Sequence, residues 1–488
     1  MAGKMQALSL SDNDRLGDPR NMTETHERAH ARGRIDPSVW KVAAVVSIGS
    51  FMAQMDATLV NVSLSTIGHE LDASIAAAQW IVSGYLLAMA LTLPLNGWLV
   101  DRVGAKRLYV FCFSAFTFAS VLCGASQSIG ELIGARVLQG LVAGVLAPMA
   151  QMMIGRVAGK HMERVMGYAT LPILLGPILG PVLAGTILMH ARWPWLFFIN
   201  VPVGALGVAL AARLLERDAA PAQRRAFDGV GFALISPGLV ALVYGLQNAA
   251  HSAGKAALFA GAALLAGFLR HSLRNGAAAL IDVRIFADRT FRAAAITQCL
   301  ANGILFGRVF AVPLYLIAGC GLSVAQAGWL VASIGVGMMV SFVLLGFLTE
   351  RFGCRAVAAG GAMLAALGAL ALVGMSSHAY SAPWTIACLF VSGLGQGTIS
   401  VPAISAAYAS MPKARLAMAN TALNIAQRMG GPLATTLLAM ALAFSMHGLA
   451  GARPHDFFMA FAVLAAFHVL CLATTLRLPP RVQHASER

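Results

Sequence analysis

An aspartate interrupts the first long apolar stretch of the chain. Asp56 stands within FMAQMDATLVNVSLS, at residues 51 to 65. A carboxylate at the centre of a membrane helix costs roughly 2.5–3.5 kcal/mol by insertion measurements, so such groups are usually functional and partnered. The chemistry open to a buried carboxylate is reversible protonation, with a proton affinity that its neighbours set.

Arg136 is the predicted partner of Asp56. It lies in GARVLQGLVAGVLAP (134–148), early in the fourth apolar stretch. At 1.5 Å per residue, Asp56 lies about 21 Å from the start of its helix, and Arg136 about 8 Å from the opposite face. In a hydrocarbon core about 30 Å thick these depths nearly coincide. We expect a pair, direct or through water, that couples protons; a structural ion pair, or Asp56 capping a helix break, are the alternatives.

Two further arginines lie inside apolar stretches. Arg308 in ANGILFGRVFAVPLYL (301–316) has a similar depth, and it could hold an anion, compete for Asp56 or reach toward the outer interface. Arg428, in LNIAQRMGGPLATTLL (423–438), lies nearer mid-depth. The residues that we expect to line a cavity for a small-molecule substrate are Asn61, Gln139, Gln298, Asn302, Arg308, Asn424 and Arg428.

Composition places the chain in a membrane. Hydrophobic residues make up 58% of the 488 residues, charged residues 11%, and the mean hydropathy is +0.74. Apolar stretches of about 20 residues, enough to cross a bilayer as a helix, recur about 14 times. We therefore predict an all-α polytopic membrane protein. The expected spans are 42–66, 77–100, 107–126, 131–154, 165–189, 194–215, 229–248, 255–273, 292–318, 325–348, 356–376, 383–408, 417–446 and 456–476.

Only two links between these spans are long, 216–228 and 274–291. They flank the seventh and eighth spans, so we expect two six-helix halves with two extra helices between them. The predicted divisions are a polar tail (1–41), an N-terminal half (42–215), a linker with the extra helices (216–291), a C-terminal half (292–476) and a second tail (477–488).

The basic charge of +15 follows the topology. Of the 35 Lys and Arg residues, 29 fall in the tails and in every second loop, and only Arg192, Lys255 and Arg453 fall in the opposite loops. Because cytoplasmic loops carry the excess of positive charge, both termini are predicted to be cytoplasmic. A nucleic-acid partner is not needed to explain the charge.

One loop occurs twice. GWLVDRVGAKRL (97–108) follows the second span, and GFLTERFGCRAV (346–357) follows the tenth. An ungapped alignment pairs Gly97 with Gly346, Asp101 with Glu350, Arg102 with Arg351 and Gly104 with Gly353. Repeated halves around a midplane site are typical of secondary transporters, and chance recurrence of short Gly/Arg-rich turns at helix ends is the alternative. We predict a cytoplasmic gate, rather than ordinary surface ion pairs, formed by Gly97, Asp101, Arg102, Gly104, Arg107, Glu350 and Arg351.

Glycine and proline are concentrated in the fifth span, LPILLGPILGPVLAG (171–185). Glycines allow helices to approach closely, and prolines weaken the helical hydrogen-bond ladder. We expect a hinge here, with dense packing as the alternative, at Gly176, Pro177, Gly180, Pro181 and Gly185.

Other patterns do not indicate a function. HERAH (26–30) fits the zinc pattern H-E-x-x-H, but it lies in a polar tail, so we expect no metal site. The chain contains no G-x-x-x-x-G-K-[ST], so we expect no P-loop, and no cofactor is predicted. The seven cysteines lack the spacing of a disulfide framework.

These stretches together resemble the major facilitator superfamily, and specifically its 14-span drug:proton antiporter branch of the EmrB/QacA type. MDATLVNVSL (55–64) is similar to the first-span motif of that branch, ARVLQG (135–140) to the fourth-span arginine motif and GPILGPVLAG (176–185) to the fifth-span motif. GWLVDRVGAKRL resembles the loop signature of the superfamily, and WPWLFFINVPVG (193–204) resembles an EmrB-like signature. The resemblance implies a major facilitator fold and proton-driven export of hydrophobic compounds through the inner membrane.

The resemblance has limits and alternatives. Pro181 replaces the usual glycine, Gln427 and Arg428 stand in reversed order, and Arg308 lies outside the usual pattern, which could favour anionic or zwitterionic cargo. Beyond the substrate, protons and the lipid bilayer, the branch implies a periplasmic adaptor and an outer-membrane channel. An exporter of a metabolite, amino acid or anionic compound, or a non-transporting receptor or scaffold, are the alternatives. No second carboxylate or His/Cys cluster accompanies Asp56, so an enzyme is not expected.

Overall fold

Helices form every element in the part of the chain that the computed structural model describes, residues 35–216, 226–249, 251–375, 380–445 and 453–481. The helices are α2 (Pro37–Glu70), α3 (Ile75–Thr92), α4 (Asn96–Val103), α5 (Ala105–Ala125), α6 (Ile129–Ala158), α7 (Met162–His190), α8 (Trp195–Phe198), α9 (Asn200–Leu214), α10 (Gly229–Gln247), α11 (Ser252–Asn275), α12 (Arg289–Leu314), α13 (Val324–Phe352), α14 (Cys354–Met375), α15 (Ala382–Gly397), α16 (Ser400–Ala409), α17 (Leu416–Ser445) and α18 (Phe458–Thr475). The HERAH stretch and most of the first tail lie outside these ranges.

Local capping explains where several long helices begin. The Asp36 side chain accepts a hydrogen bond from the Ser38 backbone N–H at 2.8 Å, and Pro37 occupies the first turn of α2. Asp288 caps α12 in the same way, accepting from the Phe291 N–H at 2.7 Å. Such side chains satisfy backbone donors that have no partner inside the helix.

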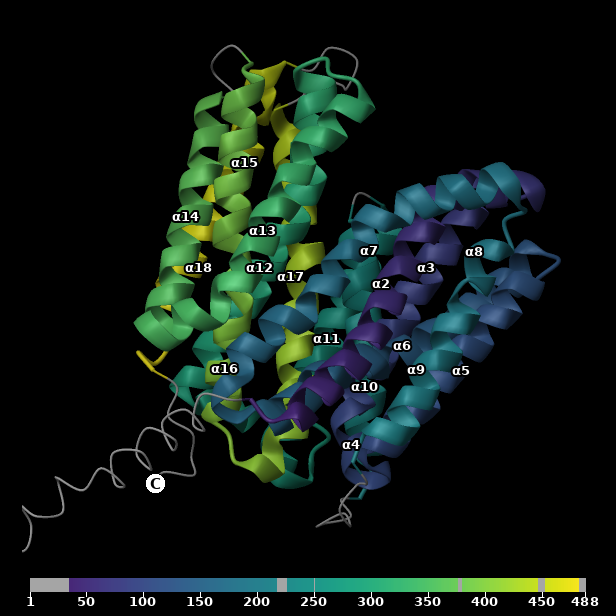
Figure 1. Cartoon of the computed structure of the whole chain (residues 1–488), viewed down its shortest axis with the longest axis vertical. Coiled ribbons are helices and arrows are strands. Elements are labelled where there is room, and N and C mark those ends of the chain that lie inside the picture. The colour runs from purple at the N-terminus through teal and green to yellow at the C-terminus, as the bar shows by residue number, and fades with distance from the viewer. Residues whose placement is uncertain (1–34, 217–225, 250, 376–379, 446–452, 482–488) are drawn as a thin grey trace, which may run out of the picture.

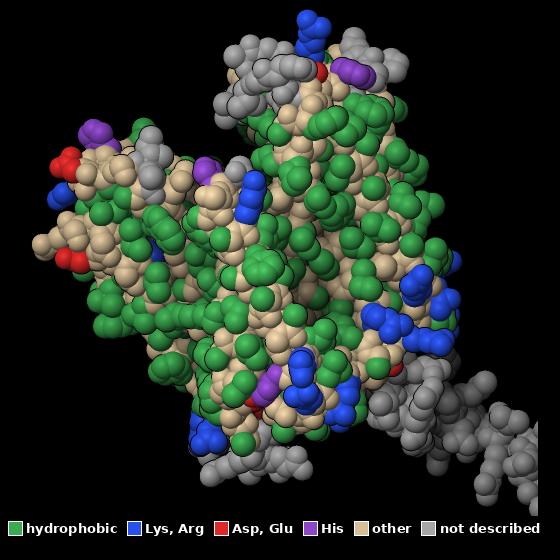
Figure 2. All heavy atoms as spheres, turned by 180° about the vertical axis from the view of Figure 1, so that it is seen from behind, with side chains coloured by type: hydrophobic (Ala, Val, Ile, Leu, Met, Phe, Trp, Pro, Cys, Tyr) green, Lys and Arg blue, Asp and Glu red, His purple; other side chains and the backbone are tan. Residues whose placement is uncertain are grey.

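Twelve helices among the described residues are long and apolar enough to cross a membrane. The predicted spans 165–189 and 417–446 correspond to α7 and α17, which are 29 and 30 residues long but are not among these twelve. The total of 14 spans therefore stays a prediction. Figure 2 shows a broad hydrophobic surface, with Lys and Arg side chains gathered mainly at the lower end of the molecule.

The helices form two lobes, α2–α9 and α12–α18, that approach each other at one end (Figure 1). We call this the inner end, since the repeated loops 97–108 and 346–357 lie there. One hydrophobic cluster, which includes Met149 and Leu423, joins both lobes at the inner end. Separate clusters fill the outer parts of the lobes, with Leu59 in the first and Phe461 in the second. The two lobes are thus in contact at the inner end and separated at the opposite, outer end. The surface between them is hollowed at the outer end (Figure 2).

The extra helices α10 and α11 pack against each other, and α10 contacts α3 of one lobe and α17 of the other. At the inner end, Asp228 accepts hydrogen bonds from the backbone N–H groups of Gly231 (2.8 Å) and Leu280 (2.9 Å) and from His271 Nε2 (2.8 Å). These bonds tie the start of α10 to α11 and to the segment that follows α11. The pair therefore bridges the two lobes where they meet.

Candidate functional site

Asp56 is fully buried inside the first lobe, and three side chains donate hydrogen bonds to it. Arg136 Nη1 donates to Oδ2 at 2.6 Å. Asn200 Nδ2 and Gln139 Nε2 donate to Oδ1 at 2.8 Å and 3.3 Å. Ser120 completes the group, because its Oγ accepts from Gln139 Nε2 at 2.8 Å. We call Asp56, Ser120, Arg136, Gln139 and Asn200 the Asp56 cluster.

Arg136 has several close neighbours besides Asp56. Its Nη1 also donates to Gln139 Oε1 at 2.6 Å, and its Nε lies 3.4 Å from the backbone oxygen of Ile81. The guanidinium carbon lies 4.3 Å from the centre of the Tyr85 ring and 5.9 Å from that of Phe197. Aromatic faces attract cations, and a buried charge is tolerated only when it is paired and hydrogen-bonded. The charges of Asp56 and Arg136 thus compensate each other, while Asn200 Oδ1 is buried without a hydrogen-bond partner among the described residues.

Four helices position the cluster. Asp56 comes from α2, Ser120 from α5, Arg136 and Gln139 from α6, and Asn200 from the first residue of α9. Arg136 and Gln139 are three residues apart, so they share one face of α6. The direct contact of Asp56 with Arg136 agrees with the depths estimated from the helix rise.

Sequence reasoning missed Asn200, Ser120 and Tyr85. Asn200 was available as a signal, since it is a polar residue inside the apolar WPWLFFINVPVG stretch. Ser120 carries no such signal, because hydroxyls often bond to their own helix.

α7 packs closely against α2 on either side of Asp56. A Cβ atom at Gly176 would lie 3.2 Å from the Met55 backbone nitrogen, and one at Gly180 would overlap the Thr58 side chain. Thr58 Oγ1 lies 3.3 Å from the Gly176 oxygen. Gly185 has open space around it, and the side chains of Pro177 and Pro181 lie outside the described part of the structure. Two glycines of the fifth-span motif thus permit the close contact of α7 with the helix that carries Asp56.

The structure distributes the seven expected cavity residues over different environments. Gln139 belongs to the buried Asp56 cluster, and Gln298 is buried with its Nε2 donating to the Ser400 oxygen at 2.6 Å. Arg308 is buried inside the second lobe, where its Nη2 lies 3.0 Å from His468 Nε2. Those with at least part of their surface exposed are Asn61, Asn302 and Arg428.

Asn424, the last expected cavity residue, belongs to the contact between the lobes. Its Nδ2 donates to Gln151 Oε1 of the first lobe at 3.3 Å. Asn420, one turn earlier on α17, donates to the Pro148 oxygen at 3.0 Å and accepts from the Tyr408 hydroxyl. These bonds join α6 to α17.

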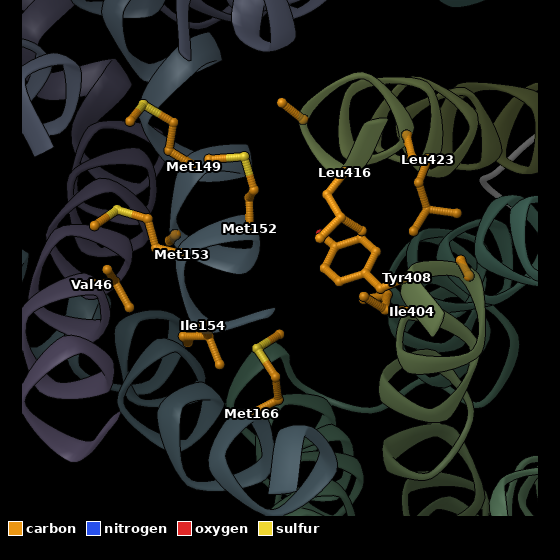
Figure 3. Close-up of a cluster of buried hydrophobic side chains, with 14 of the residues drawn as sticks. Val46, Met149, Met152, Met153, Ile154, Met166, Ile404, Tyr408, Leu416 and Leu423 are labelled. Carbon is orange, nitrogen blue, oxygen red and sulfur yellow. The ribbon is translucent and has the colours of Figure 1, made fainter. Parts of the chain in front are cut away.

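Buried apolar residues of both lobes lie next to these polar contacts along α6 and α17. Figure 3 shows methionines and other apolar residues of the first lobe beside residues from α16 and α17 of the second. Its labelled members, all buried, are Val46, Met149, Met152, Met153, Ile154, Met166, Ile404, Tyr408, Leu416 and Leu423. Methionine is flexible and fits irregular gaps, so such a contact can form and separate with little strain. We call this set the inner seal.

The glycines of the repeated loop have equivalent roles in the two lobes. Gly104 and Gly353 end α4 and α13 with φ of +94° and +84°, a conformation that L side chains rarely adopt. A Cβ at Gly97 would lie 3.1 Å from the Ala417 oxygen of α17, and one at Gly346 would lie 2.6 Å from Arg164 Cβ of α7. Each lobe thus uses the first glycine of its loop for close approach to the other lobe.

Two arginines of the repeated loop lie beside aromatic rings. The Arg102 guanidinium lies 5.5 Å from the Trp98 ring centre, and Arg351 lies 5.7 Å from that of Phe352. Glu350 is exposed and makes no ion pair with another described residue, while Asp101 and Arg107 do take part in interactions. The cytoplasmic gate that we expect these residues to form stays a prediction.

Comparisons with known proteins agree with this architecture. The model of the Major Facilitator Superfamily matches residues 46–434 and 294–488. The "Multidrug resistance protein B homolog" of Mycobacterium tuberculosis is 33% identical over 423 residues, covering 85% of this chain and 78% of that protein. MdtD of Citrobacter koseri, provisionally named a multidrug resistance protein, is 28% identical over 457 residues, covering 91% and 94%.

Solved structures show the same fold. A double tryptophan mutant of XylE superposes with a TM-score of 0.64 at 14% identity, covering 90% of this chain and 95% of that one. The human organic anion transporter MFSD10 gives a TM-score of 0.62 at 14% identity, covering 90% and 99%. With two lobes, a repeated inner loop, and a family model that matches most of the chain, this multi-pass membrane protein belongs to the Major Facilitator Superfamily.

Proposed function

We propose that this protein exports hydrophobic or amphipathic small molecules across the inner membrane in exchange for protons. The observation that carries the proposal is the Asp56 cluster, in which a fully buried carboxylate is held by Arg136, Gln139 and Asn200. Intramembrane ionisable groups mark proton and substrate pathways. The names of the multidrug resistance relatives support the substrate class, and the family supports a transporter rather than an enzyme.

Protonation of Asp56 would change the contact between α2 and α6. The proton would remove the negative charge that faces Arg136, and with it an attraction that is strong away from water. Arg136 Nη1 would keep a neutral acceptor in Gln139 Oε1, so loss of the ion pair would weaken the contact of α2 with α6 without leaving Nη1 unpaired. Gln139 is on this account a positioning residue for the coupling reaction.

α7 offers a route from Asp56 to the contact between the lobes. Gly176 and Gly180 pack against α2 beside Asp56, and Gly167, nearer the inner end, packs against Phe342 of α13. A shift of α2 would therefore reach the second lobe through α7. We propose that the halves 42–215 and 292–476 rock about this contact, opening the inner seal and closing the outer hollow.

The orientation and the partners are part of the proposal. We place both termini in the cytoplasm, because Lys and Arg are concentrated in the corresponding loops. The inner seal would then be closed on the cytoplasmic side in this conformation. A periplasmic adaptor and an outer-membrane channel rest on the resemblance to EmrB-like proteins alone.

Everted membrane vesicles test the coupling role. With an acid interior, addition of ethidium should release protons from wild-type vesicles and not from Asp56→Asn vesicles, measured with a pH-sensitive dye. Asp72→Asn is the matched control, because Asp72 is exposed and its φ of +48° suits asparagine. If Asp56→Asn exports ethidium against a gradient with an unchanged proton response, Asp56 does not couple transport to protons.

One observation favours the alternative of an exporter of anionic compounds. Arg308 places a cation inside the second lobe, where no acid of the described residues pairs with it. Replacing ethidium by a carboxylate-bearing fluorophore in the same vesicles separates the two substrate classes.

A further inference from the structure

Arg308 and His468 lie side by side in the interior of the second lobe. Arg308 of α12 is 2% exposed and His468 of α18 is 0% exposed. His468 Nδ1 lies 2.7 Å from the Leu464 oxygen, and His468 Nε2 lies 3.0 Å from Arg308 Nη2. A backbone oxygen can only accept, so Nδ1 carries the hydrogen, and Nε2 accepts from Arg308 as the lone pair of a neutral imidazole.

This contact leaves most of the guanidinium without an acceptor. Arg308 Nε and Nη1 are buried and have no hydrogen-bond partner among the described residues. Arg136 in the first lobe differs, since it contacts Asp56, Gln139 and the Ile81 oxygen. Buried donors without acceptors are strongly unfavourable, and those of a charged group most of all.

No acidic residue of the second lobe can neutralise Arg308. Between residues 292 and 476 the sequence contains only two acids, Glu350 and Asp456. Glu350 lies near the inner end of α13, and Asp456 lies before α18, where it accepts from the Arg453 backbone N–H at 2.8 Å. His468 is 12 residues after Asp456, about 18 Å along a helix. A neutral imidazole supplies one lone pair and no negative charge.

The surroundings of the pair are apolar. On α12, Arg308 lies between Ile304 of one buried cluster and Ala311 of another. On α18, His468 lies between Leu464 and Cys471 of the same two clusters. The pair therefore sits where two hydrophobic clusters meet, in a setting that makes an uncompensated charge costly and an anion next to it correspondingly favourable.

We propose that Arg308 and His468 form a binding site for a small monovalent anion inside the second lobe. The guanidinium supplies the charge, and its unpartnered Nε–H and Nη1–H groups lie on opposite sides of Nη2. His468 takes only one of the two Nη2 hydrogens, so the other forms, with Nε–H or with Nη1–H, a pair of parallel donors that suits a carboxylate or a halide. His468 holds Nη2 and so fixes the direction in which the other donors point. The site goes beyond the proposed proton coupling, and binding of the anion does not depend on it.

Anion-dependent thermal unfolding of the purified full-length protein tests the site. The chain has seven free cysteines, of which five are buried, so a thiol-reactive fluorophore reports unfolding. Sodium chloride and sodium acetate should raise the melting temperature relative to sodium gluconate at equal ionic strength. Arg308→Gln should lose this rise, and Lys255→Gln, which removes an exposed cation of the opposite loops, should keep it.

Two further variants keep the test decisive. If Arg308→Gln does not fold, Arg308→Lys is measured in its place. This variant should need a higher anion concentration to reach half of the maximal increase in melting temperature, because a lysine offers a point charge without the planar fork. His468→Gln retains an acceptor for Nη2 of Arg308, so its melting temperature should still increase with chloride and acetate. The proposal is overturned if wild type melts alike in all three salts, or if Arg308→Gln responds as wild type does. Hydration of Arg308 by water alone would give the first of these results.

A transport measurement identifies the source of the anion. A carboxylate-bearing fluorophore and its methyl ester are compared in proteoliposomes with and without chloride. If the anion is part of the substrate, Arg308→Gln should lose export of the acid and keep export of the ester. If it is a halide, export of both compounds by the wild type should require chloride. A failure of proton coupling would leave the unfolding results unchanged, so the two proposals can fail separately.

Discussion

Arg136 Nη1 lies 2.6 Å from a carboxylate oxygen of Asp56 and, through the same nitrogen, 2.6 Å from Gln139 Oε1. One donor group thus serves a charged acceptor on α2 and a neutral acceptor on its own helix. This arrangement lets the charge on Asp56 change without leaving Arg136 unpaired.

Removal of Arg136 alone should be strongly destabilising. Arg136→Gln leaves the buried Asp56 carboxylate without its cation, and breaking one side of a buried pair costs about 3–5 kcal/mol. The double variant Asp56→Asn with Arg136→Gln removes both charges and should recover most of that loss. Thermal unfolding of the purified proteins measures this difference. Equal losses in the single and double variants would mean that the two charges are not coupled.

Substitution of the first glycine in either copy of the repeated loop should weaken the inner seal. Gly346→Ala places a methyl group 2.6 Å from Arg164 Cβ, whereas Gly97→Ala meets the Ala417 oxygen at 3.1 Å, so the first change should act more strongly. A loss of about 1.4 kcal/mol from the contact would shift the balance between closed and open forms about tenfold.

Cross-linking measures the state of the seal. Gln151 and Asn424 contact each other across the lobes, and oxidation of the Gln151→Cys, Asn424→Cys pair should give less cross-link in the Gly346→Ala background. Gly360→Ala is the control, because a Cβ there meets nothing within 4 Å. An unchanged yield with Gly346→Ala would show that close approach at this glycine is not needed for the seal.

Asp228 should make stability depend on pH below neutrality. Its partial burial opposes ionisation, but the hydrogen bonds from Gly231, Leu280 and His271 outweigh burial and hold the pKa of the carboxyl below its usual range. Asp228→Asn should therefore cost about 1–2 kcal/mol at pH 7, since asparagine still caps α10 but loses the charged bonds.

The sign of this effect can be checked by titration. The carboxylate contributes its full stabilisation above the usual pKa of about 4 and loses it as the pH falls through the lower value in the folded protein. The unfolding temperatures of wild type and Asp228→Asn should converge only below about pH 4. Convergence between pH 7 and 5 would assign the stabilisation to another group.

The sequence by itself determined the helical class and the repeated loop, and it predicted Arg136 as the partner of Asp56 at the same depth. Each of these depends only on positions along the chain. Apolar stretch length identifies a membrane helix, and rise per residue gives the depth of a charge within it. The positive φ of Gly104 and Gly353 likewise repeats at positions that the alignment had paired.

Only the tertiary structure decided which helices face each other. The depth of a residue does not specify the direction in which its side chain points around the helix. The depth estimate therefore gave Arg308 the same level as Asp56, but it could not show that the two residues lie in different lobes. The same limit concealed Asn200 beside Asp56, Ser120 beside Gln139, and His468 beside Arg308. These contacts join residues 144, 19 and 160 positions apart, and packing of the helices within each lobe brings them together.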